Sequence, residues 1–246
     1  MTTTITRTTT TSERVALVTG AAGGIGGAIA GRLERDGWLV HGVDVADGDL
    51  TTEGGNRAVI AAAIDRFGQL DAVVASAGFQ HVSPVAEFPE ERWNALISLL
   101  LTSPFLLAKY SWESLGASGD GRFVAIASVH GLVASPFKVG YVAAKHGLLG
   151  LVKVLALEGA ERGIAATAVC PGFVRTPLVE SQIAAQAQAH GLPEERVLED
   201  VLLAPQAVKR LIEPEEVAEV VAFLAGPGGR AFTGVPVTMD LGWTAR

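Results

Sequence analysis

An apolar run that ends in a cluster of glycines is the feature that most restricts the fold of this chain. Val15 to Thr19 is rich in β-favouring residues, and glycines separate it from a helical pattern over 25–36. A continuous apolar run of this kind indicates a parallel strand buried on both faces. Glycines between such a strand and a helix let backbone N–H groups approach a pyrophosphate. The loop predicts a dinucleotide site, with an ordinary glycine-rich turn as the alternative.

Strand and helix patterns alternate along the rest of the chain, which predicts an α/β fold with a doubly wound parallel sheet. Strands are expected over 15–19, 38–44, 70–75, 122–127, 164–169 and 236–239. Helices are expected over 25–36, 56–67, 89–115, 141–157, 182–212 and 215–224, with an interruption near Pro104. We expect a single Rossmann-like domain over 14–246, in which 178–212 forms a helical lid over the substrate.

The composition narrows the class of partner. The net charge of −7 argues against nucleic acid, and the single cysteine excludes a disulfide within the chain. No stretch of membrane-spanning length is free of charge and unbroken by glycine, so no membrane partner is expected and a cytoplasmic location is predicted. The Thr-rich segment 1–13 is expected to be a disordered tail, because it has little apolar surface to bury. No metal site is predicted.

An acidic residue stands at the end of the second expected strand. Asp44 follows the glycine loop at the spacing at which a carboxylate can accept hydrogen bonds from both ribose hydroxyls and repel a 2′-phosphate. This position predicts NAD as the cofactor. The alternative is a solvated aspartate at a strand end.

Three polar residues carry a pattern that suits proton transfer. Tyr141 and Lys145 lie four residues apart, hence on one helix face, and Ser128 ends the strand before that helix. The lysine charge is expected to lower the pKa of the phenol, which could then exchange a proton with an alcohol or carbonyl oxygen held by the serine hydroxyl. Each residue alone would be an ordinary surface group.

The Thr-Gly-x3-Gly-x-Gly loop from Thr19, together with Ser128, Tyr141 and Lys145 in this order, resembles the short-chain dehydrogenase/reductase family over nearly the whole chain from Glu13. The resemblance implies that Ser128, Tyr141 and Lys145 are catalytic. It also implies a set of NAD-binding residues: Gly20, Gly24, Ile25, Gly26, Asp44, Ala77, Gly78, Tyr141, Lys145, Pro171, Gly172, Val174 and Thr176.

Within this family, the stretches around His130, Tyr141, Arg175 and Trp243 are similar to the bacterial D-3-hydroxybutyrate dehydrogenases. The resemblance implies a small 3-hydroxy acid, best (R)-3-hydroxybutyrate, interconverted with its 3-keto acid. Two alternatives remain: a dehydrogenase for another small alcohol or ketone, and an NAD(H)-binding protein of low turnover. The implied substrate-binding residues are Gln80, Ser128, His130, Lys138, Tyr141, Phe173 and Gln182. Homotetramers joined through the helices 89–115 and 141–157 are also implied.

Two positions depart from this pattern. Leu100 stands where the family commonly has an asparagine whose main-chain carbonyl helps to hold a proton-relay water. Pro104 lies four residues on and lacks an N–H, so our hypothesis is that it frees the Leu100 carbonyl; the alternative is that Pro104 only starts the next helix and the relay is impaired. Phe173 replaces a tryptophan, which removes one donor to a substrate carboxylate.

The cofactor half of the chain is short. Asp44 and Leu70 are only 26 positions apart, where the family has a helix, an edge strand and a second helix. Only the 56–67 helix fits in this interval, so we expect six strands, with the usual third, terminal strand and its preceding helix missing. The strand over 38–44 should then form an exposed sheet edge beside a more open adenine pocket.

Overall fold

The computed structural model describes residues 13–245, so the expected tail lies outside the described residues except for Glu13. Within these residues, six parallel strands form one sheet in the order β2-β1-β3-β4-β5-β6. They are β1 (Val15–Thr19), β2 (Leu39–Val43), β3 (Ala72–Ala75), β4 (Arg122–Ile126), β5 (Ala165–Pro171) and β6 (Pro236–Met239). This confirms the predicted doubly wound α/β fold. Within the described residues β2 pairs only with β1, so it forms the sheet edge as predicted.

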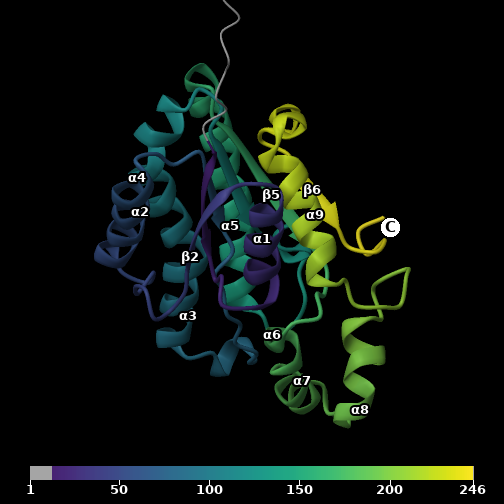
Figure 1. The fold of residues 1–246 in the computed structure, drawn as a ribbon. Helices are drawn as coiled ribbons and strands as arrows, with labels where there is room; N and C mark the ends of the chain where they lie inside the picture. Colours follow the sequence, from purple (N-terminus) through teal and green to yellow (C-terminus); the bar gives the residue numbers. More distant parts are fainter. Residues whose placement is uncertain (1–12, 246) are drawn as a thin grey trace, which may run out of the picture.

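Helices cover both faces of the sheet. The helices α1 (Gly24–Arg35) and α9 (Pro214–Ala225) pack side by side on one face, whereas α2 (Glu53–Phe67), α4 (Ser103–Ala117) and α5 (Val139–Gly159) cover the other (Figure 1). Alternate residues of β1 enter the two cores, with Leu17 on the α2 side and Val18 on the α1 side. A buried strand must therefore be apolar at every position, which is what the sequence pattern predicts. Short 3₁₀ turns occupy Val85–Glu87, Val129–Gly131, Ala160–Arg162 and Pro227–Phe232.

Two helical stretches, Glu90–Ala117 and Val139–Arg162, are long and apolar enough by length and composition to span a membrane. Both lie against the sheet in this fold, since α4 contacts β3 and α5 contacts β5. Their buried faces belong to the same core cluster, to which Leu107 and Leu148 contribute. Packing against the sheet therefore accounts for much of their apolar character.

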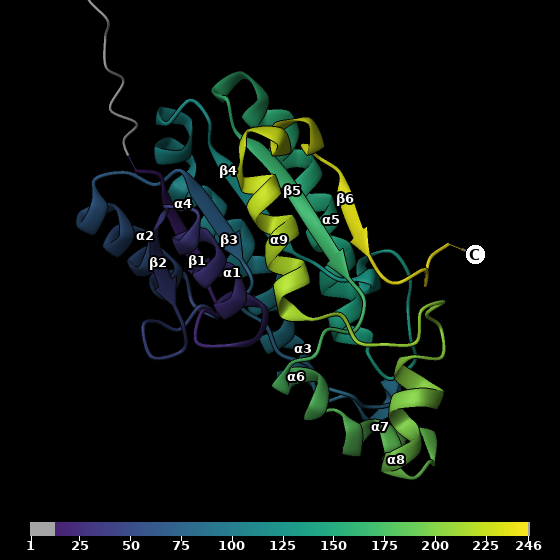
Figure 2. The same cartoon turned by 45° about the vertical axis from the view of Figure 1, so that its right-hand side comes forward.

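The helical region expected over 182–212 is divided into short elements. The structure has α6 (Pro177–Glu180), α7 (Ile183–His190) and α8 (Glu194–Val197), followed by a π-helical turn over Leu198–Leu202 and an irregular segment. Gly191 takes a left-handed φ of 65° at the end of α7, and Pro193 precedes α8. These short helices lie beyond the carboxyl ends of the strands (Figure 2). Their role as a lid stays a prediction.

Candidate active site

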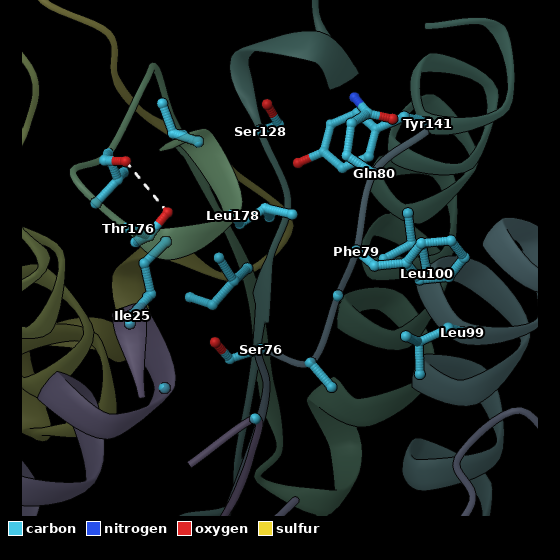
Figure 3. Close-up of a pocket in the computed structure, with 18 of the residues that line it drawn as sticks. Ile25, Ser76, Phe79, Gln80, Leu99, Leu100, Ser128, Tyr141, Thr176 and Leu178 are labelled. Carbon is cyan, nitrogen blue, oxygen red and sulfur yellow. Dashed lines mark hydrogen bonds between the residues drawn. The ribbon is translucent and has the colours of Figure 1, made fainter. Parts of the chain in front are cut away.

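A cavity of about 740 Å³ lies where the strand order reverses between β1 and β3, at the carboxyl ends of the strands. Open α/β sheets bind ligands in this crevice. Leu99 and Leu100 line one wall and Ile25 faces them from across the cavity, while Ser128 and Tyr141 lie at its far end (Figure 3). Every residue that the sequence analysis assigned to the cofactor, the substrate or catalysis lines this cavity. Their individual roles stay predictions.

The glycine loop forms a cradle that a side chain would fill. A Cβ atom on Gly26 would lie 2.2 Å from the carbonyl oxygen of Gly20, so only glycine permits this close approach of α1 to the loop. Among residues 13–245, no side chain caps the start of α1. Its first N–H groups and the positive end of the helix dipole are therefore suited to an anion such as a pyrophosphate.

Two side chains fix the loop to the strand ends. The Thr19 hydroxyl oxygen accepts hydrogen bonds from the backbone N–H groups of Ser76 (2.9 Å) and Ala77 (3.0 Å), which joins the ends of β1 and β3. One carboxylate oxygen of Asp44 accepts from the Ala22 N–H at 2.9 Å. Asp44 therefore orders the loop and also lines the cavity, with further acceptor capacity for ribose hydroxyls.

The structure brings Ser128, Tyr141 and Lys145 to the other end of the cavity. Ser128 follows β4, while the other two residues occupy the first two turns of α5. The Lys145 ammonium donates a 2.7 Å hydrogen bond to the Ile126 carbonyl and lies 5.5 Å from the centroid of the Tyr141 ring. A bond to a β4 carbonyl thus fixes the lysine beneath the phenol.

The expected effect of the lysine on the phenol is wrong for the cavity as it stands. Burial raises the pKa of Tyr141 to about 12, against a lowering contribution from a hydrogen bond with Ser128. Burial also lowers the pKa of Lys145 to about 8. Desolvation disfavours the charged form of both groups, and it is the largest cause of both shifts.

Four of the substrate-binding residues that the resemblance implies are polar groups suited to an anion, and we call Gln80, His130, Lys138 and Gln182 the anion clamp. Lys138 is its one charged member. Lys138 is 3% exposed, and burial lowers its pKa to about 8. Its ammonium lies 4.8 Å from the centroid of the Phe173 ring and forms no hydrogen bond or ion pair with another described residue. A buried cation without an anionic partner is costly, so this position suits an anionic ligand.

The other polar members of the clamp are neutral donors. Burial lowers the pKa of His130 to about 3, so its ring is uncharged and lies between the hydroxyls of Ser128 (3.4 Å) and Ser135 (3.0 Å). The side-chain amide oxygen of Gln80 accepts a hydrogen bond from the His81 backbone N–H, which leaves the side-chain N–H₂ group of Gln80 available. Gln182 instead donates to the Leu178 carbonyl, and its buried oxygen has no partner among the described residues.

Trp243 is a site residue that the sequence analysis did not assign. Its ring stacks on Phe173 with the centroids 5.5 Å apart, and it meets the His130 ring edge-on at 5.3 Å. It lines the same cavity. The sequence gives one signal for this role, which is that Trp243 lies in a segment resembling the hydroxybutyrate dehydrogenases. No local sequence pattern indicates that this segment contacts Phe173 and His130.

The helix beneath the site departs from α geometry just before Pro104. The residues of α3 (Glu90–Ile97) continue into a π-helical turn over Ser98–Thr102, and α4 begins at Ser103. The helix interruption predicted near Pro104 is therefore the wider π-helical turn over Ser98–Thr102, which ends just before the proline. The Leu100 side chain is buried in this turn and lines the cavity. A water held by the Leu100 carbonyl stays a prediction.

The fold and the site together define a nucleotide-binding oxidoreductase. Residues 39–244 match the family model described as enoyl-(acyl carrier protein) reductase. The chain is 40% identical to D-beta-hydroxybutyrate dehydrogenase of Rhizobium meliloti, covering 95% of this chain and 99% of the relative. It is 37% identical to the enzyme of the same name from Cupriavidus necator, covering 95% and 98%.

A solved structure gives the same result. A single-residue variant of actinorhodin polyketide ketoreductase, crystallised with NADPH, superposes with a TM-score of 0.87 at 32% identity, covering 95% of this chain and 98% of that chain. The chain therefore belongs to the short-chain dehydrogenase/reductase family, whose members bind a nicotinamide cofactor. The glycine cradle, the free start of α1 and Asp44 fit such a cofactor.

Proposed function

We propose that this protein is an NAD-dependent dehydrogenase that interconverts a small 3-hydroxy acid and its 3-keto acid, with (R)-3-hydroxybutyrate and acetoacetate as the best pair. Lys138 carries this proposal, because it is buried without a hydrogen-bond or ion-pair partner among residues 13–245 and lies in the same cavity as Ser128 and Tyr141. A small hydroxy acid brings both the alcohol that such a pair can act on and a carboxylate for the lysine. The names of the two relatives support the same substrate class.

Each protein group has a distinct part in this reaction. Ser128 holds the substrate oxygen, and Tyr141 takes the hydroxyl proton as the hydride leaves the carbinol carbon. Lys145 binds the nicotinamide ribose, and Lys138, Gln80 and the neutral His130 orient the carboxylate. When bound, an oxidised nicotinamide would supply the hydride acceptor, and its positive charge would favour the phenolate form of Tyr141.

The cofactor is NAD in this proposal because Asp44 occupies the loop end of the cavity. Its carboxylate would repel a 2′-phosphate. The structural neighbour holds NADPH, so the choice needs a direct test. We expect Asp44→Ala to lower the ratio of kcat/KM for NAD to that for NADP. An unchanged ratio would contradict the assignment of Asp44.

Initial rates of NADH formation with a panel of 2-, 3- and 4-hydroxy acids and uncharged alcohols test the substrate class. We expect the highest kcat/KM for (R)-3-hydroxybutyrate. Tyr141→Phe should lower kcat by about 10²- to 10⁴-fold. Higher kcat/KM for an uncharged alcohol would overturn the proposal.

Two residues favour the alternatives. Phe173 lacks the donor expected of a hydroxybutyrate enzyme and supports a dehydrogenase for another small alcohol or ketone. Leu100 in place of asparagine supports a protein that binds NAD(H) with low turnover. Faster oxidation of another alcohol would favour the former, and tight NADH binding without turnover of any panel member would favour the latter.

We also propose a cytoplasmic homotetramer joined through α4 and α5. Phe105 on α4 and Leu157 on α5 are large apolar residues with 46% and 80% of their surface exposed, and a second copy of the chain would cover them. Light scattering should report four subunits, and Leu157→Glu should reduce that number. A monomeric wild-type protein would contradict this assembly.

A further inference from the structure

A buried asparagine lies between the short connection after β2 and the helix beneath the active site. Asn56, in the first turns of α2, has no exposed surface. Its amide nitrogen donates to the carbonyls of Leu50 (2.8 Å) and Thr52 (2.7 Å). Its oxygen accepts a 2.6 Å hydrogen bond from the Ser103 hydroxyl. Both amide hydrogens and one oxygen lone pair are thus used, which fixes the orientation of the amide.

The bond to the Leu50 carbonyl holds a wall of the cavity. Residues 48–51 line it beside Asp44, at the end that suits the adenosine half of a dinucleotide. Leu50 is also 7% exposed and packs into the core beneath. The position of this wall therefore depends on the hydrogen bond that the buried Asn56 amide donates to the Leu50 carbonyl.

The wall rests directly on the start of α2. A Cβ atom on Gly55 would lie 2.0 Å from the Asp49 carbonyl oxygen, so the helix backbone touches the turn. Thr52 caps α2 by accepting from the Gly55 N–H at 3.1 Å, and its hydroxyl donates to the Asp49 carbonyl at 2.9 Å. Asn56 adds the bond to Leu50 that none of these contacts makes.

The third bond reaches the helix that carries a second part of the cavity lining. Ser103 is 2% exposed and opens α4 immediately after the π-helical turn, in which Leu99 and Leu100 line the cavity. A single buried side chain therefore joins the segments behind two walls of one cleft. A leucine or valine would fill the space but would leave the Leu50 carbonyl and the Ser103 hydroxyl without these partners, whereas the Thr52 carbonyl would keep its bond from the backbone N–H of residue 56.

We propose that Asn56 is a positioning residue that holds the 48–51 wall at the separation from α4 required by the adenosine half of the cofactor. This inference rests on the proposed cofactor site. Asn56 itself does not line the cavity, and so it acts through Leu50 and Ser103. Loss of the link should weaken cofactor binding, while the proton-transfer groups at the other end of the cavity stay in place.

The experiment compares three variants by calorimetric titration with NAD and with ADP-ribose, which lacks the nicotinamide. Ser103→Ala removes only the link to α4, and Asn56→Ala removes all three bonds. Ser111→Ala is the matched control, because Ser111 is equally buried on α4 and bonds only to the Leu107 and Ala108 carbonyls of its own helix. Thermal unfolding of each variant sets a working temperature at which all of them are folded.

We expect Kd for both ligands to rise about threefold to tenfold in Ser103→Ala and more in Asn56→Ala. The KM for NAD should rise in parallel, and kcat at saturating NAD should stay within about twofold. A fourth protein that combines Asn56→Ala with Ser103→Ala should lose no more affinity than Asn56→Ala alone, because Ser103 has no asparagine to contact once Asn56 is replaced. Ser111→Ala should lose thermal stability without a change in Kd.

An unchanged Kd in both Ser103→Ala and Asn56→Ala would overturn the inference. The proposed function would still stand in that case, provided that the wild-type enzyme binds and uses NAD. A fall in kcat without a rise in Kd would also overturn it. A rise in Kd of the same size in Ser111→Ala would reduce the effect to general destabilisation and refute the positioning role. A wild-type protein that binds neither ligand would refute the cofactor site and this inference together.

Discussion

The titration of Lys138 should control how tightly the enzyme holds a carboxylate. Burial lowers its pKa to about 8, so the ammonium is mostly charged at pH 7 and mostly neutral at pH 9. Only the charged form attracts the carboxylate. Affinity for a small carboxylate should therefore be constant below about pH 7, fall about twofold near pH 8 and fall about tenfold by pH 9.

The inhibition constant of acetate against the hydroxy acid, measured across this range at saturating cofactor, tests the expectation. Lys138→Met keeps the volume and removes the charge, so its inhibition constant should be about tenfold or more higher at pH 7. The difference between the two pH profiles isolates Lys138, because Lys145 also has a pKa of about 8 and remains in both proteins. Lys153→Met is the control, because Lys153 is an exposed lysine within α5.

The same pKa predicts a cost in stability for the empty enzyme. A fall from 10.5 to about 8 corresponds to about 3 kcal/mol at pH values where the lysine is charged in both states. Between pH 8 and 10.5 the unfolded chain binds more protons than the folded one, so stability contributed by this group rises with pH. Lys138→Met should raise the Tm at pH 7 by several degrees. A wild-type acetate constant that does not change from pH 7 to 9, or a Tm that falls in Lys138→Met, would refute the reasoning.

Three further substitutions test the cavity. Gly26→Ala should abolish measurable cofactor binding by calorimetry, because its Cβ would lie 2.2 Å from the Gly20 carbonyl oxygen; wild-type affinity would contradict the close approach. Pro104→Ala restores an N–H after the π-helical turn and should change turnover and its pH profile; unchanged kinetics would remove any role for the Leu100 carbonyl. Phe173→Trp adds an indole N–H and should lower the KM for the 3-hydroxy acid about tenfold, whereas a KM that rises would place the carboxylate elsewhere.

The fold was predictable where one physical requirement fixes the residue type over a whole segment. Strands buried on both faces must be apolar at each position, as in Val15–Thr19, and the next helix must start with glycines to approach the loop. The missing edge strand followed from the count of residues between Asp44 and Leu70. The broken helices after Pro177 were less predictable, although Gly191 and Pro193 are helix-ending signals that the polar, Ala-rich pattern outweighed.

The charge state of the site could not be predicted, because it depends on burial that no local pattern reports. Four residues apart on a helix, Tyr141 and Lys145 suggest mutual stabilisation as a charged pair. In the fold, both lie in a poorly solvated site, so the pKa of the phenol rises and that of the ammonium falls. The contact of Trp243 with Phe173 is likewise a tertiary event between segments far apart in the sequence.

The short cofactor half explains why a buried polar link is retained at this place. An additional strand would hold the cavity wall through a ladder of backbone hydrogen bonds, but β2 has no neighbour beyond it among the described residues. The turn at 48–51 is therefore held by side chains, and Asn56 satisfies one of its carbonyls, that of Leu50, while it also bonds to Thr52 and to Ser103 on α4. A satisfied polar network in a buried setting rigidifies its surroundings, whereas an apolar residue would leave the turn free to slide. In a fold with no strand beyond β2 among the described residues, Asn56 thus provides hydrogen bonds that hold the 48–51 wall in place.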